Sequence, residues 1–413
     1  MADKPQVFIS YRKSGGQTPQ IAVDLARSLK EAYGYEVFLD VMTMRTADAW
    51  RQRIYDNIRK SDVLILLLRK DTAESDWVQR EVDFARGAGV SILPLRVDDI
   101  DSSELLEAAD QLAISDLQHS PFFSGLPSDY DRLLDDIRRL TKETRRNQRA
   151  FLDQLARRWR PTPPTISQAR YRTFRIPGGS SSCLVHLALG DMLDMEYFDV
   201  IVNSENDHMQ MARYFEYTAL SSRLRTMGAL VEGGMTLEDT LQDHLNEQMR
   251  RGAIKRPVGL TQVLVTRAGH PHSELRQIAS LVFHASTVRL AAGEMDESIK
   301  PISPDGIKKT VRNCLQAMIA LNQNGAGNLP STPEDRDIHP IGSIIFPMIG
   351  AGSGERAIED VVHPIVEGVN SFMQRYCENP GLASLTRIYL CAYTQSDAEV
   401  LEKAMRSHLE PVV

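Results

Sequence analysis

The sequence predicts two α/β domains joined by a proline-rich connector. At 413 residues the chain is long enough for two or three domains of ordinary size. Short apolar runs alternate with amphipathic segments of helix length, which favours sheets connected by crossover helices. The run PTPPT at 161–165 cannot continue a helix and indicates an exposed connection between the halves.

The first half alternates strand and helix patterns in strict order. We expect strands over QVFISY, EVFLDV, DVLILLL and VSILPLRV, and helices over TPQIAVDLARSLKEAYG, ADAWRQRIYDNIRKS and the segment from Trp77 to Ala85. This order predicts a doubly wound parallel sheet. Such a sheet binds its ligand at the carboxyl ends of the strands.

The second half, of about 240 residues, mixes the two patterns less regularly but still predicts an α/β domain. Strands are expected over SCLVHLAL, FDVIVNSEN, LTQVLVTRAG, SIIFPMIGAGSG and SLTRIYLCAY. Helices are expected at 210–251, from about Glu274, at 304–321, at 357–376 and from Ser396. Ser303-Pro304-Asp305 before an apolar periodic run is typical of a helix start.

The segment before PTPPT is the one strongly basic stretch. Residues 138–160 hold nine Arg or Lys against two acids, a pattern typical of a solvated helix face. We therefore divide the chain into a first domain at 1–140, a basic helical linker with a proline-rich end at 141–172, and a second domain at 173–413.

Composition excludes several classes of function. A formal net charge of −7 disfavours a general nucleic-acid binder, because phosphate neutralisation needs a basic surface. The longest apolar runs are shorter than the roughly 20 residues that span a membrane, and the start MADKPQ has no signal-peptide core, so we expect a cytoplasmic protein without a membrane partner. Four cysteines without a CxxC pair indicate neither a disulfide framework nor a metal site.

In the segment SDWVQREVDFA, Trp77 and Glu81 are four residues apart, so on a helix they lie one turn above each other. An aromatic ring beside a carboxylate is a plausible binding site, although an exposed Glu near a half-buried Trp is common. Spacing alone leaves both interpretations open.

The first half resembles a TIR domain over about 135 residues. The resemblance is carried by VFISYR, EVFLDV, the stretch reaching Trp50, SDVLILLL, SDWVQRE and SILPLRV. It implies a flavodoxin-like fold. In TIR domains that cleave NAD+, the glutamate of the S-x-W-x-x-x-E pattern is catalytic, and Glu81 matches it here. The family often has glycine where Ala47 stands, a departure that concerns the loop rather than the carboxylate.

The resemblance implies NAD+ as a substrate, with no further cofactor and no metal. A fixed carboxylate suits cleavage of the nicotinamide–ribose bond, because it can hold the ribose hydroxyls or stabilise the positive sugar. The other residues implied to contact NAD+ follow the strands or flank the loops: Ser10, Tyr11, Arg12, Asp40, Trp50 and Trp77. The amides of Gly15 and Gly16, with Arg12, are candidates to meet the diphosphate.

In the second half, IFPMIGAGSGERAIEDVV places three glycines between a strand and a helix. Glycine permits close backbone approach, and amides at a helix N-terminus favour a phosphate. A tight turn explains the pattern equally well. GDMLDMEYFDVIVNSEN adds an aspartate and two asparagines after strands, where asparagine also simply forms turns.

Together these segments resemble a macro domain over residues 175–413, which implies a mixed-sheet, three-layer α/β/α fold that binds ADP-ribose. The matching positions for the adenine amine, the distal ribose, the diphosphate and the adenine ring are Asp191, Asn203, Asn206, Gly350, Ala351, Gly352, Ser353, Gly354 and Tyr393. Tyr393 is equally compatible with the core.

The sequence departs from macro domains that remove ADP-ribose. A run of glycines usually follows the asparagines, whereas DHMQMARYFEYT stands here. We expect His208, Met209 and Tyr214 either to line an altered ribose end or, since Met and aromatics at helical spacing usually pack inside, to belong to the core. Hydrolysis of protein-linked ADP-ribose is disfavoured, and binding of a modified ADP-ribose is favoured.

The two resemblances combine into one expected function. The chain looks like a TIR-macro effector of Thoeris-like anti-phage defence, in which an ADP-ribose-derived messenger from a separate TIR protein binds the macro domain. The TIR domain would then hydrolyse NAD+ to nicotinamide and ADP-ribose, as a homo-oligomer or filament. Two alternatives stay open: a non-catalytic TIR scaffold with an ADP-ribose reader, and a synthase of a cyclic or base-exchanged ADP-ribose signal.

Overall fold

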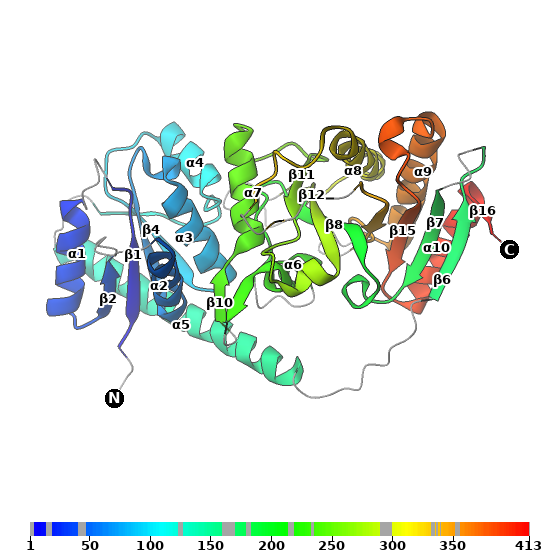
Figure 1. The fold of residues 1–413 in the computed structure, drawn as a ribbon. Coiled ribbons are helices and arrows are strands. Elements are labelled where there is room, and N and C mark those ends of the chain that lie inside the picture. The colour runs from blue at the N-terminus through cyan, green and yellow to red at the C-terminus, as the bar shows by residue number, and fades with distance from the viewer. Residues whose placement is uncertain are drawn as a thin grey trace. The chain divides into compact units, whose positions relative to one another are not determined.

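The computed structural model describes most of the chain as two compact units (Figure 1). The described residues are 4–13, 19–39, 47–122, 127–158, 170–178, 183–213, 219–232, 235–289, 300–331, 335, 338, 340–351 and 356–412. Unit 1 extends from the N-terminus through a long helix that ends at Arg158, and unit 2 holds the later sheet and its helices. In the part of the chain described, no helix is long and apolar enough to cross a membrane.

Unit 1 is built on a five-stranded sheet in the order β2-β1-β3-β4-β5, with every pair parallel. This is the flavodoxin-like strand order and confirms the predicted fold. The strands are β1 (Gln6–Ser10), β2 (Glu36–Leu39), β3 (Val63–Leu68), β4 (Ser91–Arg96) and β5 (Ser120–Pro121). The helices are α1 (Gln20–Glu31), α2 (Ala47–Lys60), α3 (Asp76–Gly87), α4 (Ser102–Gln111) and α5 (Pro127–Arg158), with the 3-10 turn η1 (Thr72–Glu74) before α3.

Helices cover both faces of this sheet. Every residue of β3 is buried, as expected for a central parallel strand between two helical layers. Leu64 and Leu66 pack in the core formed with α2, α3 and α4. Ile65 and Leu67 pack on the opposite face, in the core formed with α1 and α5.

Helix α5 is a structural part of unit 1. Leu133, Ile137 and Leu140 of α5 are buried in the sheet core, and farther along the helix Thr144 Oγ1 accepts a hydrogen bond from Ser91 N at 2.9 Å. The expected domain end at residue 140 therefore falls inside a continuous helix. The expected linker, 141–172, includes both the second half of α5 and the first residues of the next strand.

Unit 2 is built on a nine-stranded mixed sheet, with β13 paired to β12 beside the path β11-β12-β8-β14-β15-β7-β6-β16. Neighbours from β12 to β7 are parallel, and the outer pairs β11–β12, β12–β13, β6–β7 and β6–β16 are antiparallel. The strands are β6 (Arg170–Arg175), β7 (Leu184–Leu189), β8 (Phe198–Asn206), β11 (Val263–Arg267), β12 (Ala279–Arg289), β13 (Lys300–Pro301), β14 (Ser343–Phe346), β15 (Arg387–Ala392) and β16 (Glu410–Pro411).

Two helical layers enclose this sheet, which confirms the predicted mixed α/β/α architecture. The helices are α6 (Leu220–Gly228), α7 (Thr240–Arg251), α8 (Pro304–Asn324), α9 (Ile358–Tyr376) and α10 (Gln395–His408), with 3-10 turns η2 (Met192–Asp194), η3 (Glu274–Gln277) and η4 (Pro380–Leu382). Alternate residues of β15 point to opposite cores: Leu390 packs with α8, α9 and α10, whereas Tyr389 packs with α6 and α7.

Two sequence predictions in unit 2 are wrong. The single helix expected at 210–251 is instead α6, a hairpin of β9 (Leu230–Glu232) and β10 (Met235–Glu238), and α7. Helix α6 ends at Gly228, whose backbone packs so closely against Gly269 that a Cβ on Gly269 would lie 2.1 Å from Gly228 O. The helix expected from Glu274 is only the turn η3, and the residues after it form β12, which runs along β8 inside the sheet.

Candidate functional site

The carboxylate of Glu81 is buried at the carboxyl end of the unit 1 sheet. Helix α3 begins after Ser75, whose hydroxyl accepts a hydrogen bond from Val78 N at 3.4 Å and so caps the helix. Glu81 lies in the second turn and is 5% exposed. Ser10, the last residue of β1, donates its hydroxyl to Glu81 Oε2 at 2.6 Å. The structure thus joins two predicted site residues that are 71 positions apart.

Trp77 stands one turn before Glu81 on α3 and is half-buried. The guanidinium of Arg80 lies over its indole, 5.4 Å from the ring centroid. A cation on an indole face is attractive and restricts the ring. The aromatic side chain expected beside the carboxylate is therefore held in place by its own helix.

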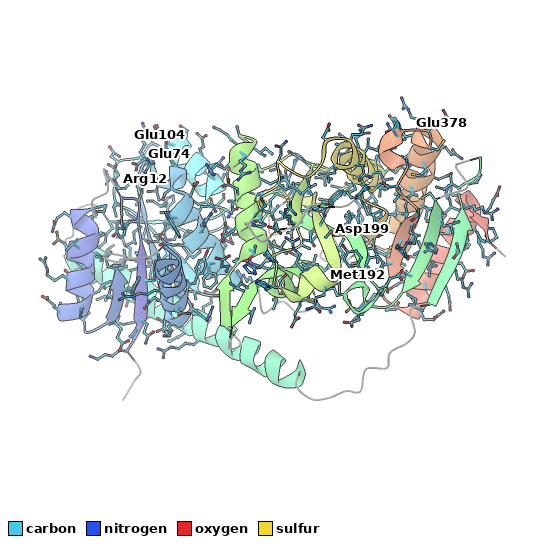
Figure 2. All side chains as sticks on the ribbon, viewed as in Figure 1. Arg12, Glu74, Glu104, Met192, Asp199 and Glu378 are labelled. Carbon is cyan, nitrogen blue, oxygen red and sulfur yellow. The ribbon has the colours of Figure 1, made fainter. Side chains whose placement is uncertain are left out.

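Arg12 is held by acidic groups rather than left open for a diphosphate. Its Nη1 donates to Glu74 Oε2 at 2.5 Å and to the carbonyl of Asp71, and its Nε lies 3.4 Å from Asp71 Oδ2. Figure 2 labels Arg12 and Glu74 at the same end of unit 1. These contacts connect the loop after β1 to the turn that precedes α3. Tyr11 beside it is buried.

Several expected residues of this site lie outside the described part of the structure. Asp40, Gly15 and Gly16 are not among the described residues, and the side chain of Trp50 is not described although its backbone belongs to α2.

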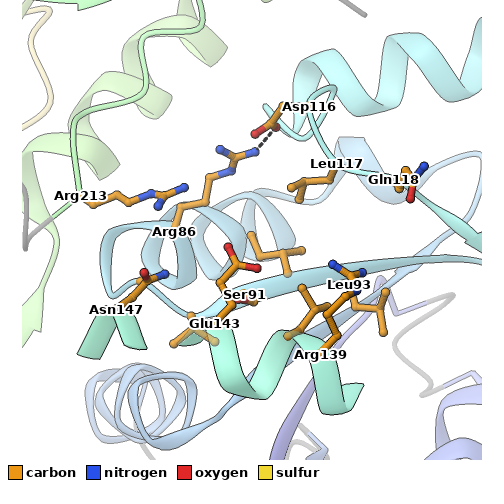
Figure 3. A pocket seen from close by; sticks show the side chains of 14 residues that line it. Arg86, Ser91, Leu93, Asp116, Leu117, Gln118, Arg139, Glu143, Asn147 and Arg213 are labelled. Atoms are coloured by element: carbon orange, nitrogen blue, oxygen red, sulfur yellow. Dashed lines mark hydrogen bonds and ion pairs between the residues drawn. The ribbon is translucent and has the colours of Figure 1, made fainter. Parts of the chain in front are cut away.

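A cavity of about 300 Å³ in unit 1 lies where β4 begins (Figure 3). Its lining includes Ser91 and Leu140, and the ion pair between Arg86 and Asp116 borders it. Ligands of open parallel sheets bind at the carboxyl ends of the strands, whereas Ser91 marks the amino end of β4. No residue expected in the NAD+ site lines this cavity among those described.

Unit 2 contains a cavity of about 530 Å³ beside the carboxyl ends of β7 and β15. Asp191, Ala351 and Tyr393 of the expected nucleotide site line it. Tyr393 is 72% exposed, so it does not belong to the core. The volume is within the range of about 300–1,000 Å³ typical of small-molecule sites.

Asp191 is held by two partners at this cavity. It follows Gly190, which has φ +128°, a backbone conformation that glycine adopts readily. Its Oδ1 accepts from Leu193 N at 3.0 Å and so caps η2, and its Oδ2 forms an ion pair with Arg223 Nη1. Arg223 comes from α6 and also lines the cavity.

The glycine loop is described only in part. Gly350 has φ +93° and its carbonyl accepts from Arg356 N at 3.3 Å, whereas Gly352, Ser353 and Gly354 lie outside the described residues. The Nε of Arg356 donates to the carbonyl of Ile302 at 3.0 Å, which holds the side chain where it lines the cavity. Helix α9 starts next to it without a side-chain cap. A helix start of this kind supports an anion.

The two asparagines expected at the distal ribose are engaged elsewhere. Asn203 is fully buried, and its Nδ2 donates to Glu205 Oε1 at 2.6 Å. Asn206 Oδ1 accepts from His208 N at 3.0 Å, and its Nδ2 donates to Gln210 O at 2.7 Å, so it forms the turn after β8. Neither residue lines the cavity.

Of the residues that replace the glycine run, the described residues 207–211 are buried inside unit 2. Met209 is fully buried in the core formed with α6 and α7, with φ +50°, and its carbonyl accepts from Gln242 Nε2 at 3.1 Å. His208 is buried, with Nδ1 3.1 Å from Asp207 Oδ1. For Met209, the core interpretation holds. Tyr214 lies outside the described residues.

A buried polar cluster beside these asparagines was not expected from the sequence. Burial raises the pKa of Glu205 to about 7, against the opposing effects of hydrogen bonds from Ser221 and Asn203. Burial also lowers the pKa of His284, on the adjacent strand β12, to about 3. At pH 7 the imidazole of His284 is therefore neutral, whereas the carboxyl of Glu205 is about half protonated.

One family model and several solved structures match the chain. The family model of the TIR domain matches residues 7–137, so unit 1 carries a TIR domain. The chain is similar to a solved Oceanobacillus iheyensis macrodomain with ADP, at 11% identity and TM-score 0.39, over 58% of this chain and 97% of that one. A Trypanosoma brucei macrodomain in complex with ADP-ribose is similar at 18% identity and TM-score 0.29, over 56% and 74%. No curated protein matches the chain.

Proposed function

We propose that the TIR domain cleaves the nicotinamide–ribose bond of NAD+ with Glu81 as the catalytic carboxylate. The observation that carries this proposal is the position of Glu81 Oε2, 2.6 Å from Ser10 at the end of β1. In the order β2-β1-β3, β2 lies on one side of β1 and β3 on the other, so the direction in which strands are added to the sheet reverses at β1. Ligands of open α/β sheets bind at this switch point, outside the carboxyl ends of the strands.

The reaction needs a group that stabilises positive charge. Nicotinamide leaves as a neutral molecule and takes the bonding electron pair, so the ribose develops oxocarbenium character. A fixed carboxylate lowers the energy of that cation, as in glycoside hydrolysis. Water then adds to the sugar, and the products are ADP-ribose, nicotinamide and one proton.

Unit 2 serves, in this proposal, as the receptor for an ADP-ribose-derived nucleotide. The cavity of about 530 Å³ offers two carboxylates, those of Asp191 and Asp397, together with two arginines and an exposed tyrosine. Asp191 can accept a hydrogen bond from the adenine amine. Arg356 and the start of α9 suit the diphosphate, and Tyr393 suits stacking on the base.

The messenger would control NAD+ cleavage through assembly of the chain into a homo-oligomer. A ligand shifts an equilibrium only by its difference in affinity for the two states, and about 5.5 kcal/mol takes a switch from 1% to 99% active. A separate TIR protein would supply the messenger as part of anti-phage defence. Because the messenger is expected to resemble ADP-ribose, product and signal share one chemical class.

The test is NAD+ consumption by the purified full chain, alone and with ADP-ribose, cyclic ADP-ribose and other ADP-ribose-derived nucleotides. We expect NAD+ loss only with one of these nucleotides, and none in Glu81→Gln or Asp191→Ala. Glu31→Gln, which removes an exposed carboxylate at the end of α1, is the matched control and should behave as wild type. Unchanged NAD+ loss in Glu81→Gln would overturn the catalytic assignment.

Calorimetric binding of the same nucleotides separates the alternatives. Tight binding without NAD+ loss under any condition would favour the scaffold, in which the TIR domain only assembles partners. Formation of a cyclic or base-exchanged product in place of ADP-ribose would favour the synthase.

A further inference from the structure

The hydrogen bond between Ser10 and Glu81 joins two nearly inaccessible side chains. Ser10 is 1% exposed and Glu81 is 5% exposed, and the distance from Oγ to Oε2 is 2.6 Å. A distance of 2.5–2.7 Å is typical of a hydroxyl that donates to a charged carboxylate. The bond connects the end of β1 to the second turn of α3. It therefore fixes one carboxylate oxygen relative to the sheet.

The direction of donation determines which state of Glu81 the bond favours. An ionised carboxylate can only accept, and the serine hydroxyl has one proton to donate. Removal of that donor from a buried site penalises the charged form, because an ionised carboxylate depends more strongly on donated hydrogen bonds than a neutral carboxylic acid does. The proposed reaction requires the charged form, since a neutral carboxylic acid does not stabilise an oxocarbenium ion.

We propose that Ser10 is a positioning residue of the TIR domain, which keeps Glu81 ionised and aimed at the sugar, and does not itself bind NAD+. The inference rests on the proposed NAD+ cleavage by Glu81. It revises the expectation that Ser10 contacts the substrate, because a hydroxyl already donated to Glu81 in a side chain that is 1% exposed has no donor left for NAD+.

The kinetic test uses Ser10→Ala in the full chain under the conditions in which the wild type consumes NAD+. One hydrogen bond to a charged group corresponds to about a ten- to hundredfold effect, so kcat should fall by that factor. KM for NAD+ should stay within about twofold, because the hydroxyl does not hold substrate. The acid limb of the kcat profile should move to higher pH by about one to two units. If Ser10 bound the substrate, Ser10→Ala would instead raise KM for NAD+ and leave the acid limb of the kcat profile in place.

Conservative and control variants distinguish positioning from simple loss of packing. Ser10→Thr keeps the hydroxyl and should restore the pH profile, and Ser10→Cys, a weak donor, should fall between alanine and wild type. Ser61→Ala is the matched control, because Ser61 is a buried serine of the same unit that donates to Asn57 O at 2.8 Å. Ser61→Ala also loses a buried hydroxyl but should leave the pH profile of kcat unchanged.

A second measurement does not depend on turnover. In protein labelled with 13C at the glutamate side-chain carboxyl, the signal that is lost in Glu81→Gln belongs to Glu81, and its titration can be followed directly. Ser10→Ala should raise the titration midpoint of that signal relative to wild type, and Ser61→Ala should not. An equal midpoint in Ser10→Ala and wild type overturns the inference, even where Glu81→Gln abolishes NAD+ loss. NAD+ loss that survives Glu81→Gln overturns the proposed function instead.

Discussion

Replacement of Glu205 by glutamine is expected to stabilise unit 2 at neutral and alkaline pH while leaving its stability near pH 4 almost unchanged. Glu205 is buried on β8, where it accepts hydrogen bonds from Ser221 and Asn203. The positive charge of Arg225 acts on it in the same direction as these bonds, and burial outweighs all three. Glutamine has nearly the shape of the protonated side chain and keeps a carbonyl oxygen for both donors.

The magnitude follows from the pKa of Glu205, which burial raises from its ordinary value of 4.5 to about 7. A raised pKa means that the folded state binds the proton more tightly, so the contribution to stability is complete below pH 4.5. It is lost as the pH rises through about 7, because the folded protein must then bury a charge that the unfolded chain exposes to water. The difference of about 2.5 pKa units corresponds to about 3 kcal/mol.

His284 gives unit 2 a dependence of the opposite sign. Burial lowers the pKa of its imidazole from 6.5 to about 3, so the unfolded chain binds the proton more tightly. Its contribution to stability is complete above pH 6.5 and is lost as the pH falls towards 3. Between pH 4.5 and 6.5 the effects of Glu205 and His284 partly cancel in the wild type. In Glu205→Gln only the rise of stability with pH due to His284 should remain.

The assay is denaturant unfolding of the full chain at pH 4, 6 and 8, with a probe specific to unit 2. All three tryptophans, at 50, 77 and 159, precede the start of unit 2, so their fluorescence reports on unit 1. Hydrogen exchange of peptides from β8 and β12, followed by mass spectrometry, reports the opening of unit 2 directly. The free energy of opening of Glu205→Gln should exceed that of wild type by about 3 kcal/mol at pH 8 and by much less at pH 4. An equal difference at both pH values would refute the reasoning.

Two further predictions concern ion pairs. Arg145 Nε lies 2.7 Å from Asp62 Oδ1, so Arg145→Gln should lower the unfolding free energy of unit 1 by about 1 kcal/mol in tryptophan-monitored denaturation. Arg146 is an exposed neighbour on the same helix, and Arg146→Gln should leave that free energy unchanged. Equal effects of the two substitutions would contradict the prediction. Arg225 and Asp239 form a buried ion pair, with Arg225 Nε 3.1 Å from Asp239 Oδ1. Asp239→Asn should therefore lower the unfolding free energy of unit 2 by about 3–5 kcal/mol, because it leaves the charge of Arg225 buried without its carboxylate. A decrease below about 1 kcal/mol, measured by hydrogen exchange, would contradict the prediction.

The fold of unit 1 could be predicted because its local patterns and its packing agree. Every residue of β3 is apolar and buried, and the amphipathic helices around it have the period that one covered face requires. Unit 2 was harder for a physical reason. The strand β12 mixes apolar residues with polar ones such as His284 and Thr287, so its sequence shows no clear alternation, and periodicity does not separate it from a buried helix. The end of α6 depends on contact between Gly228 and Gly269, which only the tertiary structure brings together.

In the candidate sites, the sequence predicted only residues that belong to local motifs. Glu81 belongs to a local pattern, but its contact with Ser10 depends on how β1 and α3 pack. Arg223, 32 positions from Asp191, stands in a helix with no pattern that indicates its partner. Asn203 matches a motif yet is fully buried beside Glu205, because the residues that follow β8 turn into the core instead of opening a ribose pocket.

The carboxylates of the two sites differ in a way that matches their proposed roles. Glu81 accepts a hydrogen bond from the neutral hydroxyl of Ser10, which orients its carboxylate. Asp191 is paired with a cation, Arg223, at the cavity of unit 2. Its charge is therefore largely compensated, and an adenine amine that approaches must share or displace the guanidinium. A carboxylate in a fixed orientation suits the stabilisation of a cationic transition state, and the ion pair at Asp191 suits recognition of a neutral base by hydrogen bonding.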